Sequence, residues 1–99
     1  MIILTVKATP LKEHKQDFIN AFHEIIDLVY AEEGCVEYEL HTSTKNDSEL
    51  FIFEKWTSKE AQENHMTTAH MVDFFKKIEP WFDTEAIMQL YNVIEEKTS

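Results

Sequence analysis

The sequence predicts an α+β protein with the ferredoxin-like βαββαβ order, in which an antiparallel sheet carries its helices on one face. Four segments have the β-branched, apolar or alternating character of strands: residues 2–8, 35–43, 49–56 and 85–94. Two stretches with helical spacing of apolar residues separate them, over residues 11–31 and 58–78. This order defines the split βαβ arrangement, and right-handed crossovers place both helices on the same side of the sheet.

The first strand and the first helix follow from local composition. The segment "IILTVKA" at residues 2–8 is β-branched and apolar, and Pro10 closes it. From Leu11 to about Ala31 apolar side chains recur at helical spacing with charged residues between them, which predicts a long amphipathic helix. Gly34 follows, where glycine can take the left-handed conformation that ends many helices.

The middle of the chain predicts a hairpin. Residues 35–43, "CVEYELHTS", alternate apolar and polar side chains, as a half-exposed strand does. The turn "TKND" at 44–47 leads directly to the strand "ELFIFEKW" at 49–56. A connection this short implies that the two strands pair. A last strand is predicted over 85–94, "EAIMQLYNVI".

The second helical stretch is predicted in two segments. Thr57 and Glu60 have the spacing of a capping box, which indicates that a helix begins just after Thr57. Thr67 and Thr68 are expected to break this helix, and a second segment then continues to about Ile78.

Composition excludes several classes of function. A chain of 99 residues with 43% apolar residues predicts one folded domain. Its net charge of −10 disfavours binding to nucleic acid or to an anionic membrane surface. The lone Cys35 fits a reducing cytoplasm, so a cytoplasmic location is expected. The apolar run at the N-terminus is too short for a signal peptide or a membrane span.

The apolar character of two strands predicts a homodimer. The strand at 49–56 is apolar on both faces, with Phe51 and Phe53 on one and Ile52 and Trp56 on the other. The last strand is also apolar on both faces. Because two helices cover only one face, we expect a second copy to cover the other, sheet against sheet, as a dimeric α/β-barrel.

A carboxylate lies within the same strand. Alternation places Glu54 with Trp56, and we expect both to lie under the helices because Phe51 and Phe53 suit a dimer interface better. A buried carboxylate needs a hydrogen bond, an ion pair or a proton. His65 and His70 are candidate partners if the break at Thr67 and Thr68 turns both toward one pocket. Tyr38, on the neighbouring strand, could supply a phenol.

A purely structural role remains an alternative for each of these residues. Glu54 could bind a backbone amide, Trp56 could be core, and either histidine could be structural or lie on the surface. Cys35 is interpreted as a small core residue. No histidine pair has the i, i+4 spacing of a metal site and no second cysteine exists, so no metal is predicted.

The pattern resembles the antibiotic biosynthesis monooxygenase domain family over essentially the whole chain. The segments that carry the resemblance are "EEGCVEYEL" at 32–40 and "FIFEKWTSKEAQENHMTTAHMVDFF" at 51–75. Their shared features are Glu-x-Gly-Cys-x-x-Tyr at one strand entry, Glu-x-Trp at the exit of the next, and a helix with Glu-Ala and then His. After a break come Ala-His and, shortly behind, a phenylalanine.

The resemblance implies a dimeric ferredoxin-like fold with a pocket between sheet and helices in each subunit. It also implies small, cofactor-independent oxygenases that act with O₂ on quinols, anthrones and similar aromatic compounds. Glu54, Trp56 and His65 match pocket positions of the quinol-oxidising and isomerase branches of the family. Tyr38 and His70 match less closely, and Phe74 is added to the substrate-binding candidates.

The resemblance to the haem-degrading branch is weaker. That branch has an asparagine in the first strand, where this chain has Ile3, Thr5 and Lys7. It also has a tryptophan where His65 stands.

An oxygenase mechanism follows from these assignments. A deprotonated phenol or quinol can pass an electron to O₂ without a metal. His65 is the expected base, since an imidazole titrates near neutral pH. Glu54 is expected to orient that imidazole, and Trp56 to form an apolar wall against the aromatic ring. Tyr38 or His70 would then bind a substrate oxygen.

Two other functions remain open. One is an isomerase in which His65 and Glu54 move protons on a small carbonyl or phosphorylated signal compound. The other is a dimeric ligand-binding module without catalysis, because a fold does not determine a function.

Overall fold

The computed structural model describes residues 1–98 and has the predicted order of strands and helices. These are β1 (Ile2–Ala8), α1 (Lys15–Tyr30), β2 (Cys35–Thr42), β3 (Leu50–Trp56), α2 (Lys59–Met66), α3 (Ala69–Ile78) and β4 (Ile87–Asn92), with 3₁₀ turns at Lys12–His14 and Glu79–Trp81. The strands form one antiparallel sheet in the order β2-β3-β1-β4. The predicted ferredoxin-like fold is therefore confirmed.

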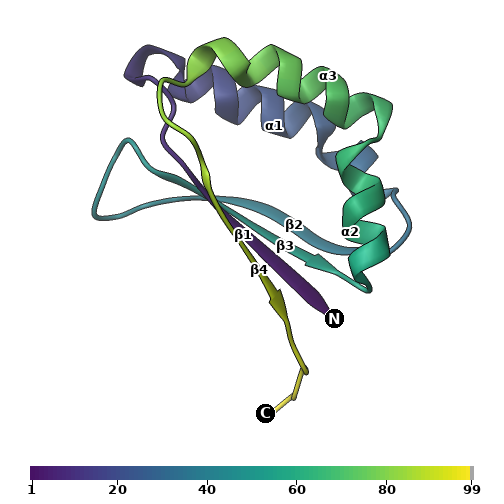
Figure 1. Ribbon diagram of the computed structural model, residues 1–99. Helices are drawn as coiled ribbons and strands as arrows, with labels where there is room; N and C mark the ends of the chain where they lie inside the picture. The colour runs from purple at the N-terminus through teal and green to yellow at the C-terminus, as the bar shows by residue number, and fades with distance from the viewer. Residues whose placement is uncertain (99) are drawn as a thin grey trace.

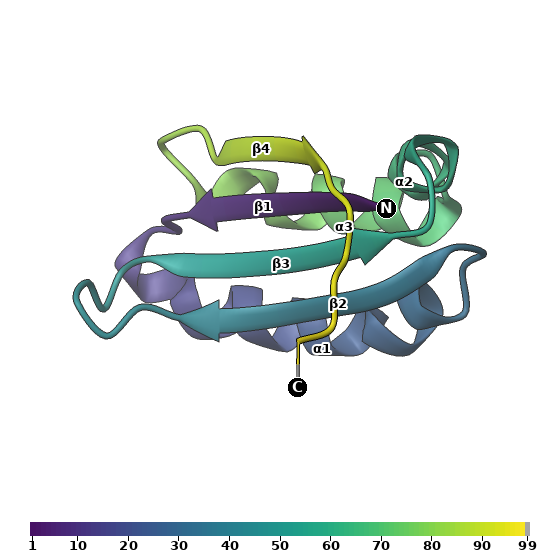
Figure 2. The same ribbon diagram turned by 90° about the horizontal axis from the view of Figure 1, so that it is seen from below.

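The helices form a layer on one face of the sheet. Figure 1 shows α1 and α3 side by side above the strands, with α2 at one end of the layer. Figure 2 shows the opposite face, where the chain beyond β4 crosses the strands. There the Val93 amide donates to the Met1 carbonyl at 3.0 Å, and Lys55 pairs with Glu95 at 2.9 Å. No helix in the described part of the chain is long and apolar enough to cross a membrane.

The hydrophobic core lies between the sheet and the helices. Its main members are Ile2, Leu4 and Val6 of β1, Leu50, Ile52 and Trp56 of β3, Phe18, Phe22 and Val29 of α1, and Met71 and Phe74 of α3. Each large apolar side chain buried in this way contributes about 1.5–3 kcal/mol relative to exposure. The period of two in β1 and β3 and the helical period in α1 therefore determine which side of each element faces the core.

The register of β3 against β1 places Glu54 on the core face. Glu54 lies opposite Leu4 and Trp56 lies opposite Ile2, and all four side chains are buried. The prediction that Glu54 and Trp56 lie under the helices is confirmed. Phe53 lies opposite Thr5 on the other face and is half-buried.

Some predicted boundaries differ from the structure. The first helix begins at Lys15 after a separate 3₁₀ turn, and the last strand covers only Ile87–Asn92. The capping-box prediction for Thr57 is wrong, because the N-cap of α2 is Ser58, whose hydroxyl accepts from the Ala61 amide at 3.1 Å. Ser and Thr cap helices through the same hydroxyl contact, so two adjacent candidates compete for the position.

The predicted break between α2 and α3 is confirmed at Thr67 and Thr68. The Thr68 hydroxyl donates to the His65 carbonyl at 3.0 Å and accepts from the Met71 amide at 3.3 Å. Thr68 is thus the N-cap of α3 and also holds the last turn of α2. This double contact sets the angle between the two helices.

Gly34 ends the loop after α1 in the predicted left-handed conformation, with φ of +85°. A Cβ atom at this position would lie 2.5 Å from the Ala61 Cβ and 2.8 Å from the Thr57 Oγ1. The Gly34 carbonyl also accepts from the Thr57 amide at 2.9 Å. Glycine is required here both for its backbone angle and for the close approach of α2.

Candidate active site

A cavity of about 450 Å³ lies between the sheet and α3. Its wall is mainly apolar, with side chains that include Phe18, Ile52, Met66, Met71, Phe74, Phe75, Ile78, Phe82 and Met88. Three polar side chains lie in the part of the wall nearest β2, β3 and α2: Tyr38, Glu54 and His65. An apolar hollow of this size with a few polar groups is typical of a site for a small organic ligand.

Glu54 is a buried carboxyl group held by one tryptophan. Only 4% of the residue is exposed, and its Oε1 accepts from the Trp56 Nε1–H at 3.0 Å. Burial raises the pKa of Glu54 to about 7, although the Trp56 hydrogen bond opposes this rise; the nearby Glu32 charge adds to it. At neutral pH the group therefore exists in both protonation states, as a proton donor or acceptor requires.

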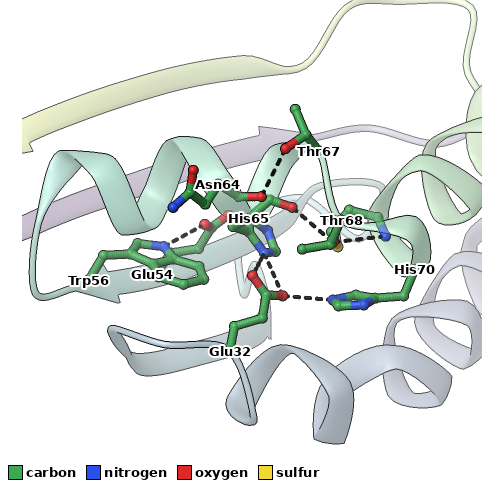
Figure 3. A network of polar contacts seen from close by, with 9 residues as sticks. Glu32, Glu54, Trp56, Asn64, His65, Thr67, Thr68 and His70 are labelled. Carbon is green, nitrogen blue, oxygen red and sulfur yellow. Dashed lines mark hydrogen bonds and ion pairs between the residues drawn. The ribbon is translucent and has the colours of Figure 1, made fainter.

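His65 is held by Glu32, a residue that the sequence did not single out. The His65 Nδ1 lies 3.0 and 3.1 Å from the two Glu32 carboxylate oxygens, and the His70 Nε2 lies 2.7 Å from Oε2. Figure 3 shows the carboxylate between the two imidazoles. We call Glu32, His65 and His70 the Glu32 cluster. An ionised carboxylate accepts only, so the facing nitrogens of both rings carry protons.

The polar side chains of the wall keep free hydrogen-bonding atoms. Every fully buried side-chain nitrogen or oxygen in residues 1–98 has a partner. Within this range no protein partner exists for the second oxygen of Glu54, the Nε2 of His65 or the hydroxyl of Tyr38. These atoms are therefore accessible, and the cavity is the hollow that all three residues line. The His65 Nε2, an acceptor, thus faces the same space as the Tyr38 hydroxyl and the second oxygen of Glu54.

Burial shifts the acid–base equilibria of the wall in opposite directions. It lowers the pKa of His65, against the opposing effect of Glu32, so the ring is neutral at physiological pH. It raises the pKa of Tyr38, with further contributions from Glu54 and Glu32, so this residue remains a phenol. The Tyr38 ring stacks on Phe22 with centroids 4.9 Å apart and meets the His65 ring edge-on at 5.4 Å.

The predicted site residues do not all lie where we expected. Tyr38, Glu54, His65 and Phe74 line the cavity together. Trp56 does not belong to the cavity wall; it is fully buried behind Glu54, with its ring 4.7 Å from that of His65. The expected substrate-facing position of Trp56 is therefore wrong, because its indole N–H is turned to the carboxylate.

The expected pairing of Glu54 with His65 is also wrong in this structure. No hydrogen bond joins them among the described residues, and Glu32 is the carboxylate that binds the imidazole. The break between the helices does bring His65 and His70 to one group, but that group is Glu32. His70 faces a second hollow rather than the cavity, so it is not placed to bind a substrate oxygen.

Cys35 behaves as the sequence predicted, as a partly buried residue against the core. Burial and the nearby carboxylates raise the pKa of its thiol to about 11, which keeps it protonated and unreactive at neutral pH. Within residues 1–98 no group of three His, Cys, Asp or Glu side chains has the arrangement of a metal site.

Comparisons with known proteins agree with this architecture. A Bacillus subtilis (strain 168) protein named "Putative monooxygenase YcnE" is 27% identical over 77 residues, which are 78% of this chain and 81% of that protein. A conserved protein from Methanosarcina mazei Go1 superposes with a TM-score of 0.87 at 24% identity, over 91% of this chain and 89% of that one. Rv0793 from Mycobacterium tuberculosis superposes with a TM-score of 0.89 at 18% identity, over 98% of both chains. At these identities the two structures show the fold alone.

The sequence pattern of one family covers most of the chain, including Tyr38, Glu54 and His65 of the cavity wall. The profile of the antibiotic biosynthesis monooxygenase family matches residues 1–77, from β1 to the last turn of α3. This range includes Glu32, Tyr38, Glu54, His65 and His70. The chain therefore belongs to the antibiotic biosynthesis monooxygenase family.

Proposed function

We propose that this protein is a cofactor-independent monooxygenase that oxidises a small quinol or phenolic aromatic with O₂. The observation that carries the proposal is the cavity wall: a carboxylate-held histidine whose Nε2 is free lies in an apolar hollow of about 450 Å³. Such a hollow suits an aromatic ring, and such a histidine suits removal of a hydroxyl proton. Family membership supports the same class of reaction.

His65 is the proposed base. Its Nε2 accepts the hydroxyl proton of the substrate, while the Nδ1–H stays bound to Glu32, which stabilises the imidazolium that forms. The resulting phenolate or enolate gives one electron to O₂, and the radical and superoxide recombine into a carbon-bound peroxide. A positioned acid–base group of this kind contributes about 10²–10⁴ in rate.

Glu54 is the proposed proton donor for the second half of the reaction. The peroxide loses water once its outer oxygen is protonated, so one oxygen atom remains on carbon as a carbonyl and the other leaves as water. The carbon that bears the peroxide loses its remaining hydrogen as a proton in this step, and the C–H electron pair forms the carbonyl as the O–O bond breaks. The substrate carbon thus gives four electrons to O₂ in all, and the two protons that the substrate loses leave in the water. With a pKa of about 7 and an oxygen open to the cavity, Glu54 can donate and recover a proton.

The cavity wall disfavours a phosphorylated substrate. Its lining contains Glu54 and Glu79 but no lysine, and the sequence has no arginine. A phosphate group is bound most strongly by cationic side chains, and this wall has none. The isomerase alternative for a phosphorylated signal compound is therefore not the function we propose.

An oxygen electrode tests the proposal. The wild-type protein should consume O₂ in the presence of one or more members of a panel of quinols and anthrones, and mass spectrometry with ¹⁸O₂ should find one labelled oxygen in the product. His65→Ala and Glu54→Gln should each lower the rate about 10²-fold or more. His23→Ala, at an exposed position on α1, is the control. Full quinol-dependent O₂ uptake in both site variants would show that the assigned roles are wrong.

A homodimer formed through the outer face of the sheet is part of the proposal. This face carries Ile3, Phe51, Phe53, Ile87 and Tyr91, and no helix lies over it in Figure 2. Apolar side chains gathered in this way favour a second copy of the sheet. Size-exclusion chromatography with light scattering tests it, and a stable monomer at micromolar concentration would contradict it.

A further inference from the structure

His70 belongs to the Glu32 cluster but not to the cavity. It lies in the first turn of α3 and faces a separate hollow of about 210 Å³ between α1 and α3, which Glu24 and Lys77 also line. Its Nε2 makes the shortest contact to Glu32, at 2.7 Å, compared with 3.0 Å for the His65 Nδ1. A role for His70 must therefore act through the carboxylate rather than through a bound substrate.

Glu32 depends on the two histidines for its position. It lies in the short connection between α1 and β2, and its side chain is only 11% exposed. A glutamate has several rotatable bonds, and holding one conformation costs side-chain entropy. Among residues 1–98, Glu32 forms ion pairs with His65 and His70 and with no lysine. If His70 were absent, only the His65 ring would hold the Glu32 carboxylate, a shielded charge that water can attract outward.

The position of Glu32 decides which nitrogen of His65 is free. While the carboxylate accepts at Nδ1, the neutral ring must carry its proton there and present the Nε2 lone pair to the cavity. If Glu32 turned away, no other side-chain contact of the described residues would fix the Nδ1 proton. The ring would then populate both tautomers, and one of them presents a donor where the reaction requires an acceptor.

We propose that His70 is a positioning residue: its Nε2–H holds Glu32 in the orientation that keeps His65 protonated at Nδ1 and free at Nε2. The inference rests on the proposed function only in treating the His65 Nε2 as the base. The contacts within the Glu32 cluster, on which the inference depends, do not involve a substrate. They run from His70, which is 19% exposed, through Glu32 to His65, which is 1% exposed.

The break between α2 and α3 is what brings both histidines to Glu32. On one continuous helix, residues five apart would point about 140° away from each other. The Thr68 hydroxyl bonds both to the last turn of α2 and to the first turn of α3, at 3.0 and 3.3 Å. Both imidazoles are thereby directed to one carboxylate, as Figure 3 shows.

Two substitutions separate a donor role from a role of charge or volume. His70→Phe keeps a ring but removes the donor to Glu32. His70→Gln removes the titratable imidazole but places a carboxamide N–H near the position of Nε2. His23→Gln, on the exposed face of α1, controls for the loss of a histidine elsewhere. Circular dichroism and thermal melting verify that each variant is folded.

Nitrogen-15 NMR of the His65 ring is the direct test, since it reports the tautomer without any substrate. We expect a single tautomer, protonated at Nδ1, in the wild type and in the variants His70→Gln and His23→Gln. In His70→Phe the two ring nitrogen resonances should move toward each other as the second tautomer becomes populated. With a quinol that is turned over, the kcat of His70→Phe should fall about tenfold or more while its KM stays nearly unchanged. The kcat of His70→Gln should be close to that of the wild type.

An unchanged His65 tautomer in folded His70→Phe would overturn the inference. A loss in His70→Gln equal to that in His70→Phe would overturn it as well, because a donor would then not be sufficient. If the wild type consumes no O₂ with any quinol, the proposed function fails, but the NMR measurement still decides the role of His70. The two failures are thus distinguishable.

Discussion

Replacing Glu54 by glutamine should make stability less dependent on pH. Glu54 is 4% exposed, and burial raises its pKa from 4.5 to about 7. Between these two values the folded protein keeps a proton that the unfolded chain has already released. The free energy of unfolding must therefore fall as pH rises through this window, because the folded state binds more protons.

The magnitude follows from the size of the shift. At 1.36 kcal/mol per pKa unit, a change from 4.5 to about 7 corresponds to about 3 kcal/mol of stability that is present below pH 4.5 and lost above pH 7. A glutamine does not titrate, and its amide oxygen can still accept from the Trp56 indole N–H. The stability of Glu54→Gln relative to the wild type should therefore rise by about 3 kcal/mol between pH 4.5 and pH 8.

Urea denaturation at several pH values measures this difference. Both proteins are unfolded at one protein concentration, and the change with pH is compared rather than the absolute offset, since the amide itself alters the packing. Glu13→Gln, at an exposed position in the first 3₁₀ turn, is the matched control. A difference between Glu54→Gln and wild type that stays constant from pH 4.5 to pH 8 would refute the reasoning.

Four further changes test other parts of the structure. Trp56→Phe removes the hydrogen bond that favours the ionised form of Glu54, so the upper end of the pH window over which stability falls should move above about 7. Glu32→Gln should lower kcat about 10²-fold or more in the oxygen-electrode assay, because an amide can reverse the His65 tautomer. Gly34→Ala should cost about 2 kcal/mol or more in urea denaturation, since its φ is +85° and Ala61 leaves no room. If the protein forms the proposed homodimer through the outer face of the sheet, Phe53→Glu should shift the light-scattering mass from dimer to monomer, and a dimer that persists in this variant would contradict that interface.

Most of the fold could be predicted because it depends on periodicity. The alternation in β3 correctly placed Glu54 under the helices, and the helical spacing in residues 11–31 correctly predicted a long helix. The break at Thr67 and Thr68 was also predicted correctly, from residue type alone. Such features are local, so a single sequence contains them.

The candidate site was predicted only in part because its contacts are not local. Glu32 is 33 residues from His65 and 38 from His70, and it lies in a loop where no period indicates a direction. The signal that could have found it was its place in the Glu-x-Gly-Cys segment, which entered only as part of a resemblance. Alternation likewise gave the correct face for Trp56, but it does not tell whether a side chain on that face lines a cavity or lies behind it.

The break between α2 and α3 has a consequence for how this sequence can change in length. A residue inserted between Thr68 and His70 would turn the His70 imidazole by about 100° about the axis of α3, relative to the Thr68 cap. The positions between the two histidines, other than Thr68, therefore tolerate substitution better than insertion or deletion. Together with the residues themselves, the number of residues in this interval therefore determines the geometry of the Glu32 cluster.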